Sequence, residues 1–361
     1  MIVESIEMKN FRNYRELDLH FDERTNIFYG DNAQGKTNIL EAVYLSGTTK
    51  SHKGCRDRDM ILFGEEEGHL RTKIRKKNLE YQIDIHLKKN RTKGIAVNGV
   101  PIRKASELFG IVNFVFFSPE DLGIIKQGPS ERRRFLDMEL CQLDRVYLHN
   151  AVSYNRALTQ RNKLLKDLAF RPELKDTLEI WDLQLAEYGK KIIEGREKFL
   201  LKLAEIVKNI HDKLSGGKEK LEILYEKNAE AEELYEKIKQ NRERDIRMKT
   251  TSAGPHRDDI LFSVGDVDIR RFGSQGQQRT AALSLKLSEI ELVKQVTDDT
   301  PVLLLDDVLS ELDQNRQNYL LSSIHDIQTL ITCTGLDEFV QHRFSINKVF
   351  RVAGGSVYGE N

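Results

Sequence analysis

The sequence contains few cysteines, a single tryptophan and no excess of either charge. Its 361 residues include three cysteines, Cys55, Cys141 and Cys333, which are odd in number and far apart. They form neither a disulfide framework nor the close spacing of a zinc site, so we expect a reducing, cytoplasmic location. Lys and Arg together number 57, as do Asp and Glu. Because the formal net charge is zero, any binding to nucleic acid must come from a local patch.

Long hydrophobic runs are also missing. The longest, 111–117 and 302–305, are far shorter than the roughly 20 residues that span a bilayer. Residues 1–14 carry charges among their apolar residues and so lack the apolar stretch of a signal peptide. Membrane insertion is therefore not expected. A hydrophobic content of 39% and a charged content of 32% are typical of a globular chain, here long enough for two or three domains.

The secondary-structure pattern changes twice along the chain. Alternating apolar and polar residues predict strands in residues 1–125, with a hairpin at Asn98-Gly99 and a buried strand at 111–117. Residues 126–249 carry apolar residues mainly at helical spacing, which predicts a mostly helical insertion. Strand patterns return in 250–361. We therefore predict an α/β fold in which 1–125 and 250–361 form one discontinuous domain, interrupted by 126–249.

A phosphate-binding loop is predicted at residues 30–37. Their sequence, Gly-Asp-Asn-Ala-Gln-Gly-Lys-Thr, fits the pattern G-x-x-x-x-G-K-[ST], with a strand before it and a helix after it. Backbone N–H groups of such a loop, and the positive end of the following helix, face phosphate oxygens. Lys36 would reach the β- and γ-phosphates of ATP, and Thr37 would bind Mg²⁺ through its hydroxyl. The predicted cofactor-binding residues of this motif are Gly30, Asp31, Asn32, Ala33, Gln34, Gly35, Lys36 and Thr37.

Two consecutive carboxylates, Asp306 and Asp307, follow the apolar run at 302–305. At the end of a buried strand, Asp306 can lie beside the phosphate loop and complete a Mg²⁺ site with Thr37. Asp307 can position or deprotonate the attacking water. We therefore predict Asp306 as a metal ligand, and Asp307 and Lys36 as catalytic residues. A helix cap after a core strand is the alternative interpretation of the pair.

A third motif begins a predicted helix at 274–293. Ser274 is suited to cap this helix, whose free N–H groups can bind an anion. An ordinary capped helix is the alternative. Lying between the phosphate loop and Asp306, the motif resembles the signature of ABC-type ATPases, which contacts the γ-phosphate of a nucleotide held by the other subunit. By this resemblance, Ser274, Gln275 and Gly276 are predicted nucleotide contacts.

The motifs together are similar to those of the bacterial RecF family. The similarity covers nearly the whole chain and includes residues 9–14, 117–122, 133–137 and 253–259. It implies an ABC-type P-loop ATPase head with a β-rich lobe and a mostly helical inserted second domain. It also implies a weak Mg²⁺-dependent ATPase that forms an ATP-dependent homodimer and acts as a clamp on duplex DNA and single-strand/duplex junctions. The family works with RecR and RecO to load RecA at gaps, in recombinational repair, replication and the SOS response to DNA damage.

The resemblance assigns one more nucleotide contact. The chain also departs from the wider ABC pattern at two positions. The contact is Arg12, for which a solvated arginine at a strand end is the alternative. Asp307 stands where transporters usually carry the longer Glu, which places the carboxylate farther from the water. No switch histidine follows the predicted strand at 330–334, where Cys333 or Thr334 stands. Both departures suggest slow hydrolysis.

A basic segment at 71–93 is the first candidate for DNA binding. It contains nine Lys or Arg residues against Glu80 and Asp84. The surface could contact phosphates, or its lysines could protect strand edges from aggregation. The predicted DNA contacts are Lys76, Lys77, Lys88, Lys89 and Arg91. Arg132–Arg134 are the next candidates, because cations in a first helical turn require compensation, either by carboxylates or by an external phosphate.

Three alternative functions fit parts of the pattern. A transport ATPase subunit would share the phosphate loop, although transporters usually carry Leu-Ser-Gly-Gly-Gln and the switch histidine. An SMC-type head would need a far longer heptad region than 126–249. A nucleotide-binding scaffold without significant turnover stays open, because Asp307 and the missing histidine both weaken the case for efficient hydrolysis.

Overall fold

The computed structural model describes residues 1–104, 107–336 and 347–360. The chain forms two compact units, one from residues 1–121 with those from 286 onward, the other from Leu122–Leu285. Residues 250–285 thus group with the helical region, whereas the sequence pattern assigns them to the ATPase domain. The physical reason is non-local strand pairing, because β9 (Leu221–Glu226) is hydrogen-bonded along its length to β10 (Asp259–Val264).

The first unit contains a mostly parallel sheet in the order β15-β14-β3-β13-β12-β8. Only β15 runs antiparallel to its neighbour. The strands are β3 (Thr25–Tyr29), β8 (Phe114–Phe117), β12 (Val302–Asp306), β13 (Thr329–Cys333), β14 (Lys348–Ala353) and β15 (Ser356–Glu360). The strand predicted at 111–117 is shorter than expected and begins at Phe114. The carboxyl ends of β3, β13 and β12 meet at one edge, which is where ligands bind in open α/β sheets.

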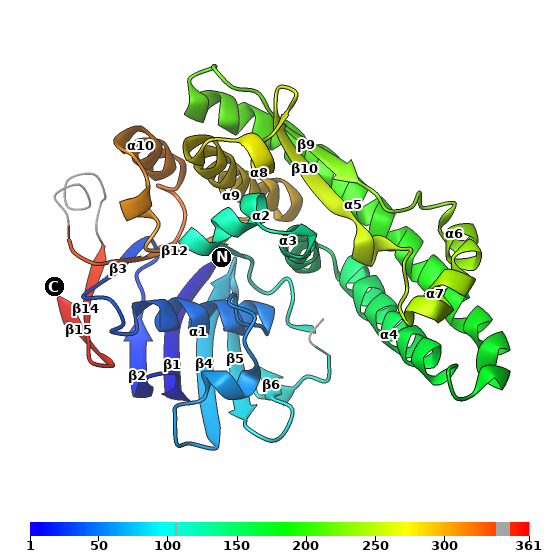
Figure 1. The fold of residues 1–361 in the computed structure, drawn as a ribbon. Helices are drawn as coiled ribbons and strands as arrows, with labels where there is room; N and C mark the ends of the chain where they lie inside the picture. Colours follow the sequence, from blue (N-terminus) through cyan, green and yellow to red (C-terminus); the bar gives the residue numbers. More distant parts are fainter. Residues whose placement is uncertain (105–106, 337–346, 361) are drawn as a thin grey trace. The chain divides into compact units, whose positions relative to one another are not determined.

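A second, antiparallel sheet of this unit has the order β2-β1-β4-β5-β6-β7 (Figure 1). Its strands are β1 (Ile2–Phe11), β2 (Tyr14–His20), β4 (Glu67–Lys76), β5 (Leu79–Lys88), β6 (Gly94–Val97) and β7 (Val100–Pro101). The predicted hairpin is confirmed between β6 and β7. Asn98 and Gly99 have φ of 51° and 76°, as the two central residues of a type I′ turn require.

Helix α1 (Lys36–Thr48) contacts both sheets, through β12 and β13 on one side and β1, β4 and β5 on the other. Ile39, Leu40 and Val43 are fully buried. Nearly the whole helix is enclosed, and an apolar surface all round is typical of a helix covered on both faces. Among the described residues, this unit also contains the part of α9 (Gln275–Thr297) from Lys286 on, α10 (Gln314–Ser323) and the short turns η1 (Asp57–Met60), η3 (Pro119–Asp121) and η6 (Leu309–Glu311).

The second unit is mostly helical, as predicted, with one three-stranded sheet in the order β11-β10-β9. Its elements besides β9 and β10 are α2 (Leu122–Lys126), α3 (Pro129–Leu143), α4 (Arg145–Asp167), η4 (Pro172–Thr177), α5 (Leu178–Ser215), α6 (Leu234–Gln240), α7 (Arg242–Met248), η5 (Pro255–Arg257), β11 (Val267–Asp268), α8 (Ile269–Phe272) and the start of α9 (Gln275–Thr297). Helices α4 and α5 pack side by side (Figure 1). Asp144 caps α4 by accepting hydrogen bonds from the Val146 and Tyr147 N–H groups.

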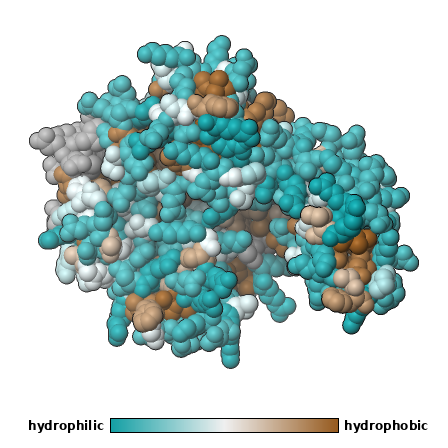
Figure 2. Space-filling view, viewed as in Figure 1, coloured by the Kyte–Doolittle hydropathy of each residue, from teal (hydrophilic) through white to brown (hydrophobic). Residues whose placement is uncertain are grey.

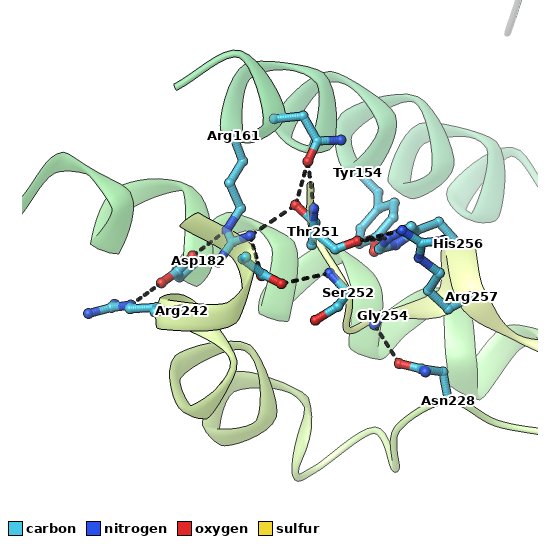
Figure 3. Close-up of polar contacts among 12 residues, drawn as sticks. Tyr154, Arg161, Asp182, Asn228, Arg242, Thr251, Ser252, Gly254, His256 and Arg257 are labelled. Atoms are coloured by element: carbon cyan, nitrogen blue, oxygen red, sulfur yellow. Dashed lines mark hydrogen bonds and ion pairs between the residues drawn. The ribbon is translucent and has the colours of Figure 1, made fainter. Parts of the chain in front are cut away.

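A buried polar network ties the segment before β10 to the helices of this unit (Figure 3). The Arg161 guanidinium lies 2.6 Å from Asp182 and 2.7 Å from Asp245, and all three side chains are fully buried. Arg161 also donates to the Thr251 hydroxyl at 2.9 Å. Breaking such a buried pair by removing one partner typically costs about 3–5 kcal/mol. The network therefore holds Thr251, in the segment that leads to β10, against the helices of this unit.

His256 belongs to the same region and lies in the short turn η5 (Figure 3). Its ring nitrogens contact the Tyr154 hydroxyl at 2.7 Å and the Thr251 carbonyl at 3.0 Å. Burial lowers the pKa of His256 to about 4, so its ring is neutral at physiological pH. The neighbouring Gly254 has a φ of 132°, and a Cβ there would lie 2.2 Å from the Tyr154 hydroxyl oxygen. This position therefore requires glycine.

Hydrophilic side chains predominate on the face of the molecule in Figure 2, and hydrophobic ones form small separate areas. Isolated exposed apolar residues are normal on globular proteins. Within the part of the chain that the structure describes, no helix is both long and apolar enough to cross a membrane.

Candidate nucleotide-binding site

The phosphate loop connects β3 to α1 at the carboxyl edge of the parallel sheet. Two of its residues must be glycine on geometric grounds. A Cβ on Gly30 would lie 2.3 Å from the Val352 carbonyl oxygen, and one on Gly35 would lie 2.5 Å from the Asn13 amide. Both residues also have positive φ, 148° and 111°. The motif glycines therefore permit close approach as well as the turn itself.

Residues from distant turns hold this loop in place. The Asn13 side-chain amide donates to the Gln34 carbonyl at 3.0 Å, and the Tyr14 hydroxyl donates to the Gly35 carbonyl at 3.1 Å. From the turn after β14, the Gly354 N–H donates to the Gln34 side chain at 2.6 Å. Asn13 and Tyr14 belong to the 9–14 segment, but sequence analysis assigned a site role only to Arg12. Their function is to position the backbone that would bind phosphate.

A cavity of about 190 Å³ lies over the loop and the first turn of α1. It is lined by Asn32, Ala33, Gln34, Gly35, Lys36, Thr37, Asn38, Lys53 and Asp307. The Lys36 ammonium donates to the Gly30 and Asp31 carbonyls at 2.6 and 3.0 Å, and its side chain is almost fully buried. Phosphate oxygens are stronger acceptors than these carbonyls, because they carry charge. The predicted loop residues are thus brought around one cavity, although Gly30 and Asp31 are not part of its lining.

The two carboxylates predicted to act together lie beside this cavity. Asp306 is 8% exposed at the end of β12, and its Oδ1 accepts the Thr37 hydroxyl at 2.8 Å and the Thr332 hydroxyl at 2.7 Å. Hydroxyl and carboxylate oxygens are the hard donors that suit Mg²⁺. No group of three or more His, Cys, Asp or Glu side chains among the described residues could hold a metal ion. A metal here would take two protein ligands, Thr37 and Asp306, with phosphate and water oxygens as the rest, as is usual for Mg²⁺.

Asp307 has a left-handed backbone conformation, with φ of 53°, and its side chain lines the cavity. Burial raises the pKa of its carboxyl group; the Lys36 charge opposes this, and the Asp306 charge adds to it. A carboxylate whose pKa is raised is a stronger base for a water proton than an exposed aspartate. The geometry therefore suits Asp307 to orienting or deprotonating a water, while Asp306 is turned toward Thr37.

The Arg12 side chain contacts a buried glutamate and is not part of the cavity lining. Its Nε and Nη2 donate to the two carboxylate oxygens of Glu41, each at 2.7 Å, and Nη2 also lies 3.0 Å from the Cys55 sulfur. Its Nη1 donates to the Asp59 carbonyl at 2.8 Å. All three guanidinium nitrogens are thus engaged by the protein. The nucleotide contact expected of Arg12 stays a prediction.

Lys53 is a cavity-lining residue that sequence reasoning missed. Its loop is held by Glu41, which is fully buried and accepts a hydrogen bond from the Ser51 hydroxyl at 2.5 Å. The Ser51 oxygen in turn accepts from the Lys53 N–H at 3.1 Å. A second lysine therefore lines the cavity over the phosphate loop. No local motif marks it, because its position depends on Glu41 and Ser51.

The signature residues lie in the second unit, at the start of α9. The Ser274 hydroxyl accepts the Gln277 N–H at 3.2 Å, and the Gln277 side chain accepts the Ser274 N–H at 2.8 Å. This reciprocal pair is a capping box, so the predicted capping role of Ser274 is confirmed. Ser274, Gln275 and Gly276 are all exposed. Their contact with a nucleotide of another subunit stays a prediction.

Many basic side chains of the 71–93 segment are engaged by hydrogen bonds or ion pairs within the protein. Lys88 and Lys89 pair with Glu67 and Glu66 at 3.8 and 2.8 Å, and Lys76 donates to a backbone carbonyl at 2.6 Å. Of the five predicted DNA contacts, Lys77 and Arg91 are exposed and form no ion pair with another described residue.

The second candidate for DNA binding also has internal partners. Arg132 is 1% exposed and pairs with Asp259 at 2.6 Å. Arg133 donates to the Asp258 carbonyl at 2.7 Å, and Arg134 lies 3.8 Å from Glu131. Compensation by the protein itself, one of the two expected possibilities, is therefore present, and Arg132 is not accessible to DNA phosphates.

Comparison with known proteins shows which family this chain resembles. The family model described as RecF/RecN/SMC N terminal domain matches residues 2–355. Proteins named DNA replication and repair protein RecF are similar to this chain. That of Lachnospira eligens is 60% identical and that of Agathobacter rectalis 63%, with at least 99% of both chains covered in each case.

Solved structures show the same relationship. The recombination mediator protein RecF bound to ATP, described as part of the RecFOR pathway, matches with a TM-score of 0.92 and 37% identity, covering 100% of this chain and 98% of that one. An SMC head domain at 16% identity, with a TM-score of 0.59, shows the fold alone. The ABC-type ATPase fold predicted from the motifs is therefore confirmed, and the chain belongs to the RecF family.

Proposed function

We propose that this chain is a weak Mg²⁺-dependent ATPase of recombinational DNA repair and replication, which uses ATP to control its binding to DNA. The observation that carries the proposal is the grouping of Lys36, Thr37, Asp306 and Asp307 at one edge of the parallel sheet. Relatives at about 60% identity are named as DNA replication and repair proteins, and a structural relative is named with ATP.

The chain's own residues would divide the reaction between them. The loop N–H groups and Lys36 would bind and orient the β- and γ-phosphates. Thr37 and Asp306 would hold Mg²⁺, which when bound neutralises charge developing on those phosphates. Asp307 would orient the attacking water and accept its proton. Its short side chain, and Cys333 or Thr334 where many ABC enzymes carry a switch histidine, support slow turnover.

We further propose that ATP drives assembly of a homodimer that closes on duplex DNA or single-strand/duplex junctions. The exposed capping box at Ser274 supports this, since N–H groups at a helix start bind anions and residues 274–276 are exposed. RecR, RecO and RecA are the proposed partners, with the cytoplasm as the location. The name of the pathway that the ATP-bound relative belongs to supports the first two partners.

The function is tested by substituting the phosphate-loop lysine. Lys36→Met should abolish ATP hydrolysis and ATP-dependent retention of duplex DNA, because a methionine carries no charge to hold the phosphates. Lys208→Met, at an exposed position of α5, is the matched control and should behave as wild type. Circular dichroism should be unchanged in both. Wild-type hydrolysis by Lys36→Met would show that the site is wrongly assigned, and single-turnover measurements on wild type would separate slow catalysis from none.

A further inference from the structure

The hydroxyl of Thr332 makes hydrogen bonds to both residues of the carboxylate pair. It donates to Asp306 Oδ1 at 2.7 Å and accepts the Asp307 N–H at 3.0 Å. Thr332 is 1% exposed and lies on β13, the strand between β3 and β12. It is directly opposite Asp306 in the parallel ladder. One hydroxyl therefore connects the two residues assigned to metal binding and to water activation.

This hydroxyl constrains the orientation of the Asp306 carboxylate. Its Oδ1 receives two hydroxyl protons, one from Thr332 and one from Thr37. With Oδ1 held from both sides, the second oxygen, Oδ2, is the one left to face a metal or a metal-bound water. Partners of this kind fix the orientation of a metal-binding carboxylate and are often as important as the ligands themselves.

The same hydroxyl also supports the unusual backbone of Asp307. A left-handed φ of 53° is uncommon for a residue other than glycine and persists only where neighbouring contacts hold it. The Asp307 N–H donates to both the hydroxyl and the carbonyl of Thr332, at 3.0 and 3.3 Å. Thr332 therefore contributes to turning the chain so that the Asp307 side chain reaches the cavity.

We propose that Thr332 is a positioning residue of the ATPase site, which sets the orientation of the Asp306 carboxylate for Mg²⁺ and the direction of Asp307 toward the attacking water. It is not among the residues that line the cavity, and it acts through these two residues. The inference rests on the proposed ATPase function and assigns a role to a residue that the phosphate-loop and carboxylate motifs do not include.

The strand offers a matched control in Thr329. It is also 1% exposed on β13, but its hydroxyl donates to the Ile327 carbonyl at 3.0 Å and contacts neither carboxylate. Thr329→Val and Thr332→Val therefore remove the same hydroxyl from the same strand at the same burial. Thr332→Ser restores the hydroxyl without the methyl group, which separates hydrogen bonding from packing.

The test measures binding of a slowly hydrolysed ATP analogue over a range of Mg²⁺ concentrations, followed by fluorescence. Thr332→Val should need about 10- to 100-fold more Mg²⁺ for half-maximal enhancement of binding, the usual cost of losing such a partner. Nucleotide affinity without Mg²⁺ should be unchanged, since the loop and Lys36 remain. In steady-state hydrolysis at saturating Mg²⁺, its kcat should fall while its KM stays near the wild-type value. Thr332→Ser should recover most of both effects, and Thr329→Val should show neither.

The outcomes distinguish this inference from the function on which it rests. A Thr332→Val variant with the Mg²⁺ dependence of Thr329→Val would overturn the inference alone. The same conclusion would follow if Thr332→Ser were as impaired as Thr332→Val, because the effect would then come from packing. If wild type showed no Mg²⁺-dependent binding, the proposed function would fail together with the inference. Should Thr332→Val not fold, as judged by thermal denaturation, Thr332→Ala takes its place under the same criteria.

Discussion

Removal of the Glu41 carboxylate should destabilise the unit that contains the phosphate loop. Glu41 is fully buried in α1, and three side chains donate to it: Arg12 through two nitrogens at 2.7 Å each, Ser51 at 2.5 Å and Cys55 at 3.7 Å. Glu41→Ala leaves the arginine and the serine hydroxyl without their acceptor. Because Glu41 also holds, through Ser51, the loop that carries Lys53, nucleotide affinity should fall as well.

The magnitude follows from how deeply the pair is buried. Breaking a buried pair by removing one partner costs about 3–5 kcal/mol, and Arg12 keeps 21% of its side-chain exposure, which favours the lower end. A loss of about 3 kcal/mol corresponds to an opening equilibrium raised by roughly two orders of magnitude. Replacing both partners, as Arg12→Met with Glu41→Leu, should cost less than Glu41→Ala alone, because no charge is then left unpaired.

Hydrogen exchange of the amides in α1 is the suitable assay, since it reports on this unit specifically. Glu66→Ala is the control: its pair with Lys89 has a distance of 2.8 Å, but both side chains are well exposed, so its loss should cost less than about 1 kcal/mol. Fluorescence of Trp181, the only tryptophan, follows α5 in the second unit. If Glu41→Ala changed α1 protection no more than Glu66→Ala does, the reasoning from burial would be refuted.

The same carboxylate predicts a direction for the pH dependence of stability. Burial disfavours the charged form of Glu41, but hydrogen bonds from Arg12 and Ser51 outweigh it, and the pKa is lowered from 4.5. A group whose folded pKa is lowered stabilises the fold above the unfolded pKa and loses that contribution as the pH falls through the folded pKa. Between neutral pH and about pH 3, α1 protection should therefore fall more in wild type than in Glu41→Ala.

Three other predictions concern the site and its assembly. Asp307→Asn should still bind ATP with Mg²⁺ but turn over much more slowly, because an amide cannot accept the water proton; single-turnover hydrolysis at the wild-type rate would contradict its role. Ser274→Arg should leave ATP binding intact but abolish the ATP-induced dimer in sedimentation, and a dimer as stable as wild type would exclude the composite site. Lys77→Gln with Arg91→Gln should reduce the slope of log affinity against log salt by about 0.9 for each lost phosphate contact, whereas Lys89→Gln should change it little. Equal slopes in all three proteins would place the DNA elsewhere.

The local motifs of the site could be predicted from sequence, because their chemistry lies in contiguous residues. The phosphate loop, the strand before Asp306 and the cap at Ser274 each depend on neighbours a few positions away. Their arrangement around one cavity follows from parallel strands, whose carboxyl ends share an edge.

Features that depend on distant partners could not be predicted. The pairing of β9 with β10 places residues 250–285 in the second unit. The sequence of neither strand indicates which strand it pairs with. Arg12, just after β1, pairs with Glu41 of α1. Lys88 at the end of β5 and Lys89 beside it pair with acidic residues in and beside β4. Strand register and side-chain burial decide these contacts, and neither is encoded locally.

The division of the chain into a continuous unit and a discontinuous one has a consequence for biosynthesis. The second unit comprises Leu122–Leu285, so all of it can emerge from the ribosome before the last strands of the parallel sheet are synthesised. In that sheet, β3 lies between β13 and β14, which are made some 300 residues later. Domains generally fold as units during synthesis, and strand pairs far apart in sequence form slowly. The nucleotide site is therefore among the last parts to form, and a chain truncated before β13 would contain a phosphate loop whose strand has no partner.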